Sequence, residues 1–266
     1  MAGDVCPVDS PLSYPGRLPD ASGVVVGDRF LALDVWEGAP LGEWGVPEAG
    51  VRLADFLASA GVAPVRERVP VVAVGSNAAP AQLRRKFAAL GARLVLPMTM
   101  ATVRGIAAGV SGHVNRHGYV PATPVVGDFR SRLFVGWFDR EQLGVLDVTE
   151  PNYVRRLVPE GAVTLESGVG VRNCHCYAGR HGHLAERECG TPVLLGSQAA
   201  VIAWLLRRSS ALARLCGRTP EEFVTRLRGD GHGRASVRDA AYVLMRAEGL
   251  VRVQAEFDTW SAGGAG

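Results

Sequence analysis

Apolar and polar positions alternate in blocks along the middle of the chain, and one block predicts a strand, a loop and a helix in direct succession. Residues 69–74 form a short apolar run rich in valine, which indicates a buried strand. The small polar turn Gly75-Ser76-Asn77 follows, and Pro80 then opens an amphipathic helix. One face of that helix carries Leu83, Phe87 and Leu90.

Further strands are predicted on either side of a polar segment. Residues 94–108 carry Thr and Val and indicate strands, and residues 132–138 indicate another. Residues 109–124 contain Gly, His and Pro, and we expect a loop that is too polar for a core element. Residues 163–177 predict more strand, broken by glycines. This mixture of strands and helices indicates the α/β (or α+β) class.

A short helix is predicted to end at Glu150. Asp139, with Gln142 three residues later, resembles a capping box and marks the start of this helix. Pro151 stops it, because the residue before a proline avoids the helical region. Glu150 is that residue, so its carboxyl group belongs to the end of a helix.

The pattern divides the chain into three parts. Residues 1–68 form an N-terminal extension with a hairpin around Gly27-Asp28 and a short helix within 51–60. Residues 69–196 form the core, and residues 197–266 form a helical C-terminal extension. Helix starts in that extension are predicted at Ser197, Thr219 and Ser236.

Composition and charge narrow the class of protein. Apolar residues make up 47% of the 266 residues, which permits a sizeable core. Basic and acidic residues number 29 and 26, and this net charge of +3 is too weak to indicate nucleic acid or an anionic membrane as a partner. Lys86 is the only lysine, which we attribute to coding bias.

The ends and cysteines of the chain predict a cytoplasmic location. The start, Met1-Ala2-Gly3-Asp4, lacks the basic and apolar regions of a signal peptide. No stretch approaches the ~20 apolar residues of a membrane span. The five cysteines show no spacing typical of a disulfide framework, so we expect a reducing compartment.

Two segments together resemble the γ-glutamylcyclotransferase-like family. The first is Val71-Val72-Ala73-Val74-Gly75-Ser76-Asn77, which resembles the family's strand and Tyr-Gly-Ser-Asn loop. The second is Leu146-Asp147-Val148-Thr149-Glu150 with Tyr153 close behind, which resembles the family's Leu-Asp-x-x-Glu segment. Their order and spacing fit the family, and the match covers less than half of the chain. Val74 departs from the pattern, because the family usually has Tyr there.

The resemblance implies a fold, a reaction and a set of site residues. The fold would be a small mixed β-barrel with surrounding helices. The reaction would be cleavage of a γ-glutamyl amide by cyclisation to 5-oxoproline, without metal or cofactor, and Glu150 would be catalytic. Substrate contacts are assigned to Val74, Gly75, Ser76, Asn77 and Tyr153. We add His113, because the polar loop between the two motifs could line a pocket.

This reaction requires few chemical groups from the protein itself. The α-amine of the substrate attacks its own γ-carbonyl, so holding the substrate folded supplies much of the rate by proximity. One carboxyl group can take a proton from the α-ammonium and later give it to the leaving amine. The Gly75-Ser76-Asn77 turn offers backbone N–H groups to an oxyanion or a carboxylate, because it precedes a helix.

Other interpretations remain open. Glu150 could be a solvated residue at a helix end, and Gly75-Ser76-Asn77 could be only a turn and a cap. Ser76 lacks the Gly-x-Ser-x-Gly setting of a nucleophile. An amide hydrolase or acyl transferase on the same fold is one alternative function. A non-catalytic binding protein of small molecules is another, and Val74 is its best support.

Two further patterns suggest binding sites that we consider less favoured. Cys174-His175-Cys176 suggests zinc, but no Cys-x-x-Cys pair accompanies it, and on a strand the histidine faces away from both cysteines. The C-terminal helices could resemble a DNA-binding helix pair, but their ten Arg and seven acidic residues form no clear stripe. We expect these helices to pack on the core or to form a homodimer. Their apolar face would comprise Val201, Trp204, Leu205, Leu212 and Leu215.

Overall fold

The computed structural model describes residues 6–228 and 236–260, and the chain folds into two compact units. Unit 1 contains residues 1–17, 108–125 and 179–255, and unit 2 contains residues 18–107, 126–178 and 256–266. The division of the chain into 1–68, 69–196 and 197–266 stays a prediction about domains. Each unit is described by itself below.

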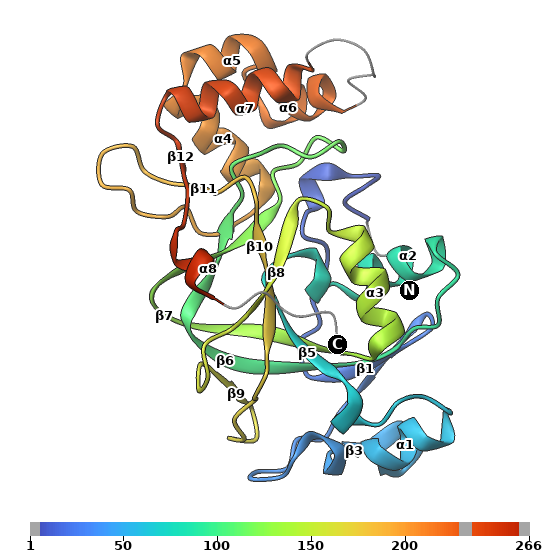
Figure 1. The fold of residues 1–266 in the computed structure, drawn as a ribbon. Helices are drawn as coiled ribbons and strands as arrows, with labels where there is room; N and C mark the ends of the chain where they lie inside the picture. The colour runs from blue at the N-terminus through green and yellow to red at the C-terminus, as the bar shows by residue number, and fades with distance from the viewer. Residues whose placement is uncertain (1–5, 229–235, 261–266) are drawn as a thin grey trace. The chain divides into compact units, whose positions relative to one another are not determined.

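A large mixed sheet organises unit 2 (Figure 1). Its strands are β1 (Gly23–Val26), β2 (Arg29–Ala32), β5 (Val69–Ala73), β6 (Val95–Val110), β7 (Ala122–Phe138), β8 (Tyr153–Leu157), β9 (Val163–Leu165) and β10 (His175–Gly179). They follow the order β2-β1-β6-β7-β5-β10-β8, and β9 pairs with β6. Strand β5 is parallel to β10 and antiparallel to β7, so the sheet is mixed. The predicted α/β class is confirmed, whereas the pairings of the described residues close no barrel.

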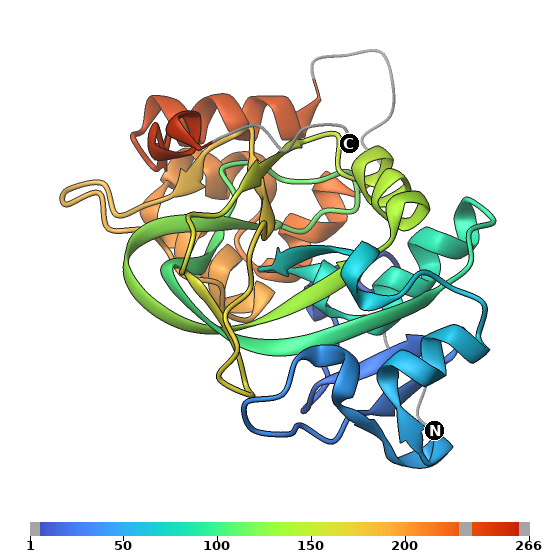
Figure 2. The ribbon, with the colours of Figure 1, turned by 60° about the horizontal axis from the view of Figure 1, so that its bottom comes forward.

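Beside this sheet, the described residues of unit 2 form four α-helices and a separate two-stranded hairpin. The helices are α1 (Leu53–Ser59), α2 (Pro80–Ala89), α3 (Arg140–Thr149) and α8 (Glu256–Thr259). Strands β1 and β2 form the predicted hairpin around Gly27-Asp28, and β3 (Gly45–Val46) pairs with β4 (Val51–Arg52). Helices α2 and α3 lie side by side in both views (Figures 1 and 2). The first motif segment therefore leads into α2, and the second motif segment ends the neighbouring helix α3.

Strand β5 is buried on both faces, which explains its unbroken apolar run. Val71 and Ala73 belong to one cluster of buried residues, and Val72 belongs to another, against which Val74 packs. We call the first cluster the helix-side core, because α2 and α3 bury their apolar residues in it. Its helical members are Leu83, Phe87, Leu143 and Leu146.

Two sequence-based expectations about burial are wrong. Leu90 does not share the buried face of α2: it follows the last helical residue and is 50% exposed. Within residues 109–124, most positions are buried, although their composition is polar. Polar groups of this segment find partners far along the chain. The side chain of Gln198, for example, donates to the carbonyl of Val120 at 2.8 Å and accepts from its N–H at 3.0 Å.

Unit 1 contains the C-terminal helices. These are α4 (Gln198–Arg208), α5 (Ser210–Cys216), α6 (Pro220–Leu227) and α7 (Val237–Ala247), with strands β11 (His183–Leu184) and β12 (Val251–Arg252). Ser197, Thr219 and Ser236 cap α4, α6 and α7 as predicted, and Ser209 caps α5, which was not predicted. The predicted apolar face is confirmed as core. None of the helices in the described ranges has both the length and the apolarity to cross a membrane.

Candidate functional site

Helix α3 brings Glu150 to a fixed position at its end. The predicted capping box starts the helix: Asp139 Oδ1 accepts from the N–H of Gln142 at 2.9 Å, and Gln142 Oε1 accepts from the N–H of Asp139 at 3.2 Å. Leu146 anchors the helix in the helix-side core. Glu150 then leaves the helical conformation, with φ −118° and ψ 51°, immediately before Pro151. Its side chain is thus held by a helix that is anchored at both ends.

The Gly75-Ser76-Asn77 turn lies between β5 and α2. It forms one turn of 3-10 helix, Ser76–Ala78, in which Ala78 donates to the carbonyl of Gly75 and Ala79 donates to that of Ser76. The first N–H groups of a helix have no acceptor within the helix. The amides of Ser76 and Asn77 occupy these positions, so they are available to an anionic group.

Asn77, Lys86 and Glu150 form a hydrogen-bonded triad, which we call the polar triad. Asn77 Nδ2 donates to Glu150 Oε1 at 2.9 Å, and Lys86 Nζ donates to the same oxygen at 2.5 Å. Lys86 Nζ also donates to Asn77 Oδ1 at 2.7 Å. The side chains of Lys86 and Glu150 are only 11% and 12% exposed. The two sequence motifs therefore meet at one point in the fold, although 73 residues separate Asn77 from Glu150.

The triad leaves one carboxylate oxygen of Glu150 without a donor. Both Asn77 and Lys86 address Oε1. Within the described part of the chain, no hydrogen bond reaches Oε2. A carboxylate oxygen with unused lone pairs can accept a proton from a bound molecule.

A second polar cluster surrounds Asp147, one helical turn before Glu150. Tyr177 on β10 donates its hydroxyl to Asp147 Oδ1 at 2.5 Å. Arg155 on β8 donates to both carboxylate oxygens of Asp147, at 3.2 and 3.3 Å. Burial raises the pKa of Tyr177, and the bond to Asp147 and the negative charges of Asp147 and Glu150 add to this rise. Tyr177 therefore stays protonated and remains a donor.

The other predicted site residues have different surroundings. Val74 packs against the core cluster on the face of β5 opposite to the helix-side core. Tyr153 packs against the helix-side core, and its N–H donates to the carbonyl of Glu150 at 3.0 Å. His113 belongs to unit 1, whereas every member of the polar triad belongs to unit 2.

His113 forms a buried polar pair in unit 1. Its Nδ1 lies 2.7 Å from Ser111 Oγ, and its ring centroid lies 4.3 Å from that of His181. The pKa of His113 is lowered to about 3. Burial is the main cause, and the nearby His181 contributes to the same lowering. The imidazole is therefore neutral near pH 7.

Sequence reasoning missed Lys86 and Tyr177 as members of these clusters. One signal could have identified Lys86: the chain has 29 basic residues, of which this is the only lysine. Coding bias explains why almost all basic residues are arginine, but it does not explain why position 86 carries a lysine. Tyr177 carried no local signal.

The two cysteines of the Cys174-His175-Cys176 segment are part of the core of unit 2. Both cysteines are buried in an apolar cluster that contains Val72. Burial raises the pKa of the Cys174 thiol to about 12, which disfavours the thiolate that a metal requires. Among the described residues, no group of three or more His, Cys, Asp or Glu side chains is arranged to hold a metal ion.

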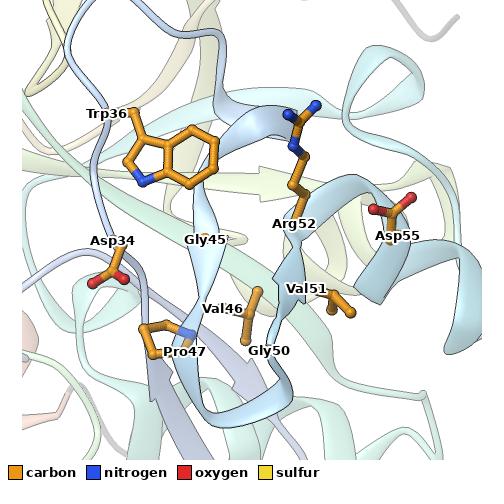
Figure 3. Close-up of a pocket in the computed structure, with 9 residues that line it drawn as sticks. All are labelled: Asp34, Trp36, Gly45, Val46, Pro47, Gly50, Val51, Arg52 and Asp55. Atoms are coloured by element: carbon orange, nitrogen blue, oxygen red, sulfur yellow. The ribbon is translucent and has the colours of Figure 1, made fainter.

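Unit 2 also has an open surface depression of about 520 Å³, formed around the β3–β4 hairpin (Figure 3). Figure 3 shows Trp36 and Arg52 at one end of the hairpin, and the guanidinium carbon lies 5.7 Å from the centre of the indole ring. Its remaining lining residues are Asp34, Gly45, Val46, Pro47, Gly50, Val51 and Asp55. None of the predicted site residues lines this depression, and its side chains are mostly exposed. The polar triad is therefore the stronger candidate for chemistry.

In comparisons with known proteins, no family model, no curated protein and no solved structure matches this chain. The resemblance to the γ-glutamylcyclotransferase-like family rests on the two motifs alone.

Proposed function

We propose that this protein cleaves a γ-glutamyl amide by intramolecular cyclisation, forming 5-oxoproline and releasing the amine. The observation that carries the proposal is the contact between the two motifs, in which Asn77 of the first donates to Glu150 of the second. A carboxylate that is held at the end of a helix, next to a turn with available amides, is the minimal equipment for this reaction.

Glu150 is the general base and then the general acid of the proposed reaction. Its Oε2 takes a proton from the substrate's α-ammonium, while Asn77 and Lys86 hold Oε1. The free α-amine attacks the γ-carbonyl carbon and forms the ring C–N bond. When the tetrahedral intermediate collapses, the exocyclic C–N bond breaks, and the leaving amine receives the proton from Glu150. The ring nitrogen then gives its second proton to the carboxylate of Glu150, which passes it to the released amine, so that a lactam N–H and an ammonium ion are the products. No water is consumed.

The Gly75-Ser76-Asn77 turn stabilises the negative charge that develops on the γ-carbonyl oxygen. Backbone N–H groups at the start of a helix are fixed donors, and fixed donors stabilise an oxyanion without reorganising. In this proposal, backbone groups from Val74 to Asn77 bind the glutamyl part of the substrate, and Tyr153 is a further substrate contact.

Val74 stands where the family usually has a tyrosine, so in this proposal the hydroxyl group of that tyrosine must be supplied by another residue or be absent. Val74 packs away from the helix-side core, so its position supplies no hydroxyl to Glu150. Tyr177 belongs to the helix-side core and carries a phenol that is held by Asp147. The small mixed β-barrel, a cytoplasmic location and a homodimer through the C-terminal helices are further parts of the proposal.

The experiment is a product assay with a matched pair of variants. The full chain is incubated with γ-glutamyl amino acids and γ-glutamyl amines, and mass spectrometry detects 5-oxoproline. Glu150→Gln should lower the rate by about 10² to 10⁴, because it removes the acid/base. Glu141→Gln makes the same change at an exposed position of the same helix and should leave the rate unchanged.

The products separate the proposal from its alternatives. Free glutamate would indicate hydrolysis, and a transferred γ-glutamyl group would indicate acyl transfer. Tight binding without turnover across the panel would indicate a binding protein. A Glu150→Gln variant with full activity would remove this residue from the mechanism.

A further inference from the structure

Lys86 is a cation in contact with Glu150, and the proposed substrate carries a negative charge close to its reacting amine. A γ-glutamyl compound has both an α-ammonium and an α-carboxylate on the same carbon. Glu150 accounts for the ammonium in the proposed reaction. The ammonium group of Lys86 shares the polar triad with Glu150, and the two charges are 2.5 Å apart.

The donors of Lys86 are not all used within the protein. A lysine ammonium has three N–H donors. Two of them point to Glu150 Oε1 and Asn77 Oδ1, and the structure gives Lys86 no further acceptor within its described residues. Its side chain is 11% exposed and is therefore not fully enclosed in the core, which leaves the third donor for a bound molecule in this proposal.

The neighbouring cation is less suited to this task. Arg155 already donates to both carboxylate oxygens of Asp147. A substrate carboxylate that bound Arg155 would have to displace this two-bond pair. Lys86 can gain a carboxylate through its third donor without losing either of its present bonds.

We propose that Lys86 binds the α-carboxylate of the substrate, so that Lys86 and Glu150 together recognise the zwitterionic head of a free α-amino acid. This inference rests on the proposed function and assigns a residue to the recognition of the substrate's α-carboxylate. Compounds with a free α-amine and a free α-carboxylate are accepted, whereas α-carboxamides and internal residues of a peptide chain are discriminated against. The same contact turns the α-carbon so that the amine faces Oε2 of Glu150.

The test compares two probes that differ only at the carboxylate. Binding of 5-oxoproline and of 5-oxoprolinamide to the full chain is measured by isothermal titration calorimetry. The wild type should bind 5-oxoproline at least about tenfold more tightly, since a charge-assisted hydrogen bond is lost with the amide. Lys86→Met should equalise the two affinities, and Lys86→Arg should retain part of the preference because it keeps the charge.

Matched controls separate this role from folding and from the proposed reaction. Arg85→Met removes a positive charge from an exposed position of the same helix and should keep the full preference. Circular dichroism checks that each variant is folded. A wild type that binds neither probe, or binds both equally, overturns the inference, and so does a preference that survives in Lys86→Met. If the preference is lost in Lys86→Met while the wild type forms no 5-oxoproline from any substrate, the inference stands and the proposed reaction fails.

Discussion

Arg68 is a buried cation that ties the site helix to the sheet. Its guanidinium has no exposed surface. It donates at 2.8 to 3.2 Å to the carbonyls of Ala63, Val95 and Trp137 and to the side chain of Gln142. Because Gln142 closes the capping box of α3, these bonds connect the strand ends to the helix that terminates at Glu150.

Replacing Arg68 with methionine should destabilise unit 2 by about 3 kcal/mol. Val95 keeps a donor, because Gln142 Nε2 reaches its carbonyl at 3.1 Å. The carbonyls of Ala63 and Trp137 lose the donor that Arg68 provides. Each unsatisfied buried acceptor costs about 1 to 3 kcal/mol, which gives about 2 to 6 kcal/mol for two. The lower half of this range applies, because both bonds are only partly buried and because methionine removes a desolvated charge.

The assay is urea denaturation followed by circular dichroism, with Arg66→Met as the control. Arg66 lies two residues earlier and pairs with Glu67, and the two side chains are 80% and 57% exposed. Exposed pairs contribute little, so Arg66→Met should change the free energy of unfolding by less than about 0.5 kcal/mol. If Arg68→Met falls within the same range, the accounting of buried acceptors is wrong.

Three further predictions follow from other contacts. Burial lowers the pKa of His113 in the folded state to about 3, whereas the unfolded value is 6.5. The unfolded state therefore binds the extra proton between these values, and stability should fall with decreasing pH by about 1.4 kcal/mol per unit across this window. His113→Asn should flatten this slope in urea titrations from pH 7 to 4, and an unchanged slope would contradict the assignment. Asn77→Asp places a second carboxylate against Glu150 and should lower 5-oxoproline formation at least about tenfold; equal rates would show that the amide of Asn77 does not matter. Gly217 has φ +102°, and a Cβ added there would lie 2.4 Å from the Cβ of Glu222. Gly217→Ala should therefore destabilise unit 1 by more than about 1 kcal/mol in a thermal melt. An unaltered melting temperature would refute this prediction.

Local signals in the sequence were sufficient for the elements that carry the site. A β-branched run, a proline and a capping box act over a few residues, so the strand, the turn and the helix before Glu150 could be predicted. The contacts that make the polar triad span 64 and 73 residues along the chain. No periodicity encodes such a pair, and only the family resemblance suggested that the Gly75-Ser76-Asn77 turn and Glu150 would meet.

Burial of polar segments was the main error, and it has a physical cause. A polar composition predicts exposure only when no partner in the fold satisfies the polar groups. Val120, within residues 109–124, obtains such a partner from Gln198, which lies 78 residues away along the chain. Tyr177 also finds its acceptor far along the chain, since Asp147 is 30 residues away.

The alternation of the chain between its two units limits how the protein can be dissected. Six consecutive segments belong in turn to one unit and the other, so the polypeptide changes unit five times. No single cleavage point releases either unit as one continuous fragment. A chain shortened at residue 196 would retain Val110, Val114 and Val120 but lose α4 to α7, whose apolar residues cover them. Activity of the polar triad should therefore be sought in the whole chain, since a fragment would expose apolar surface and aggregate.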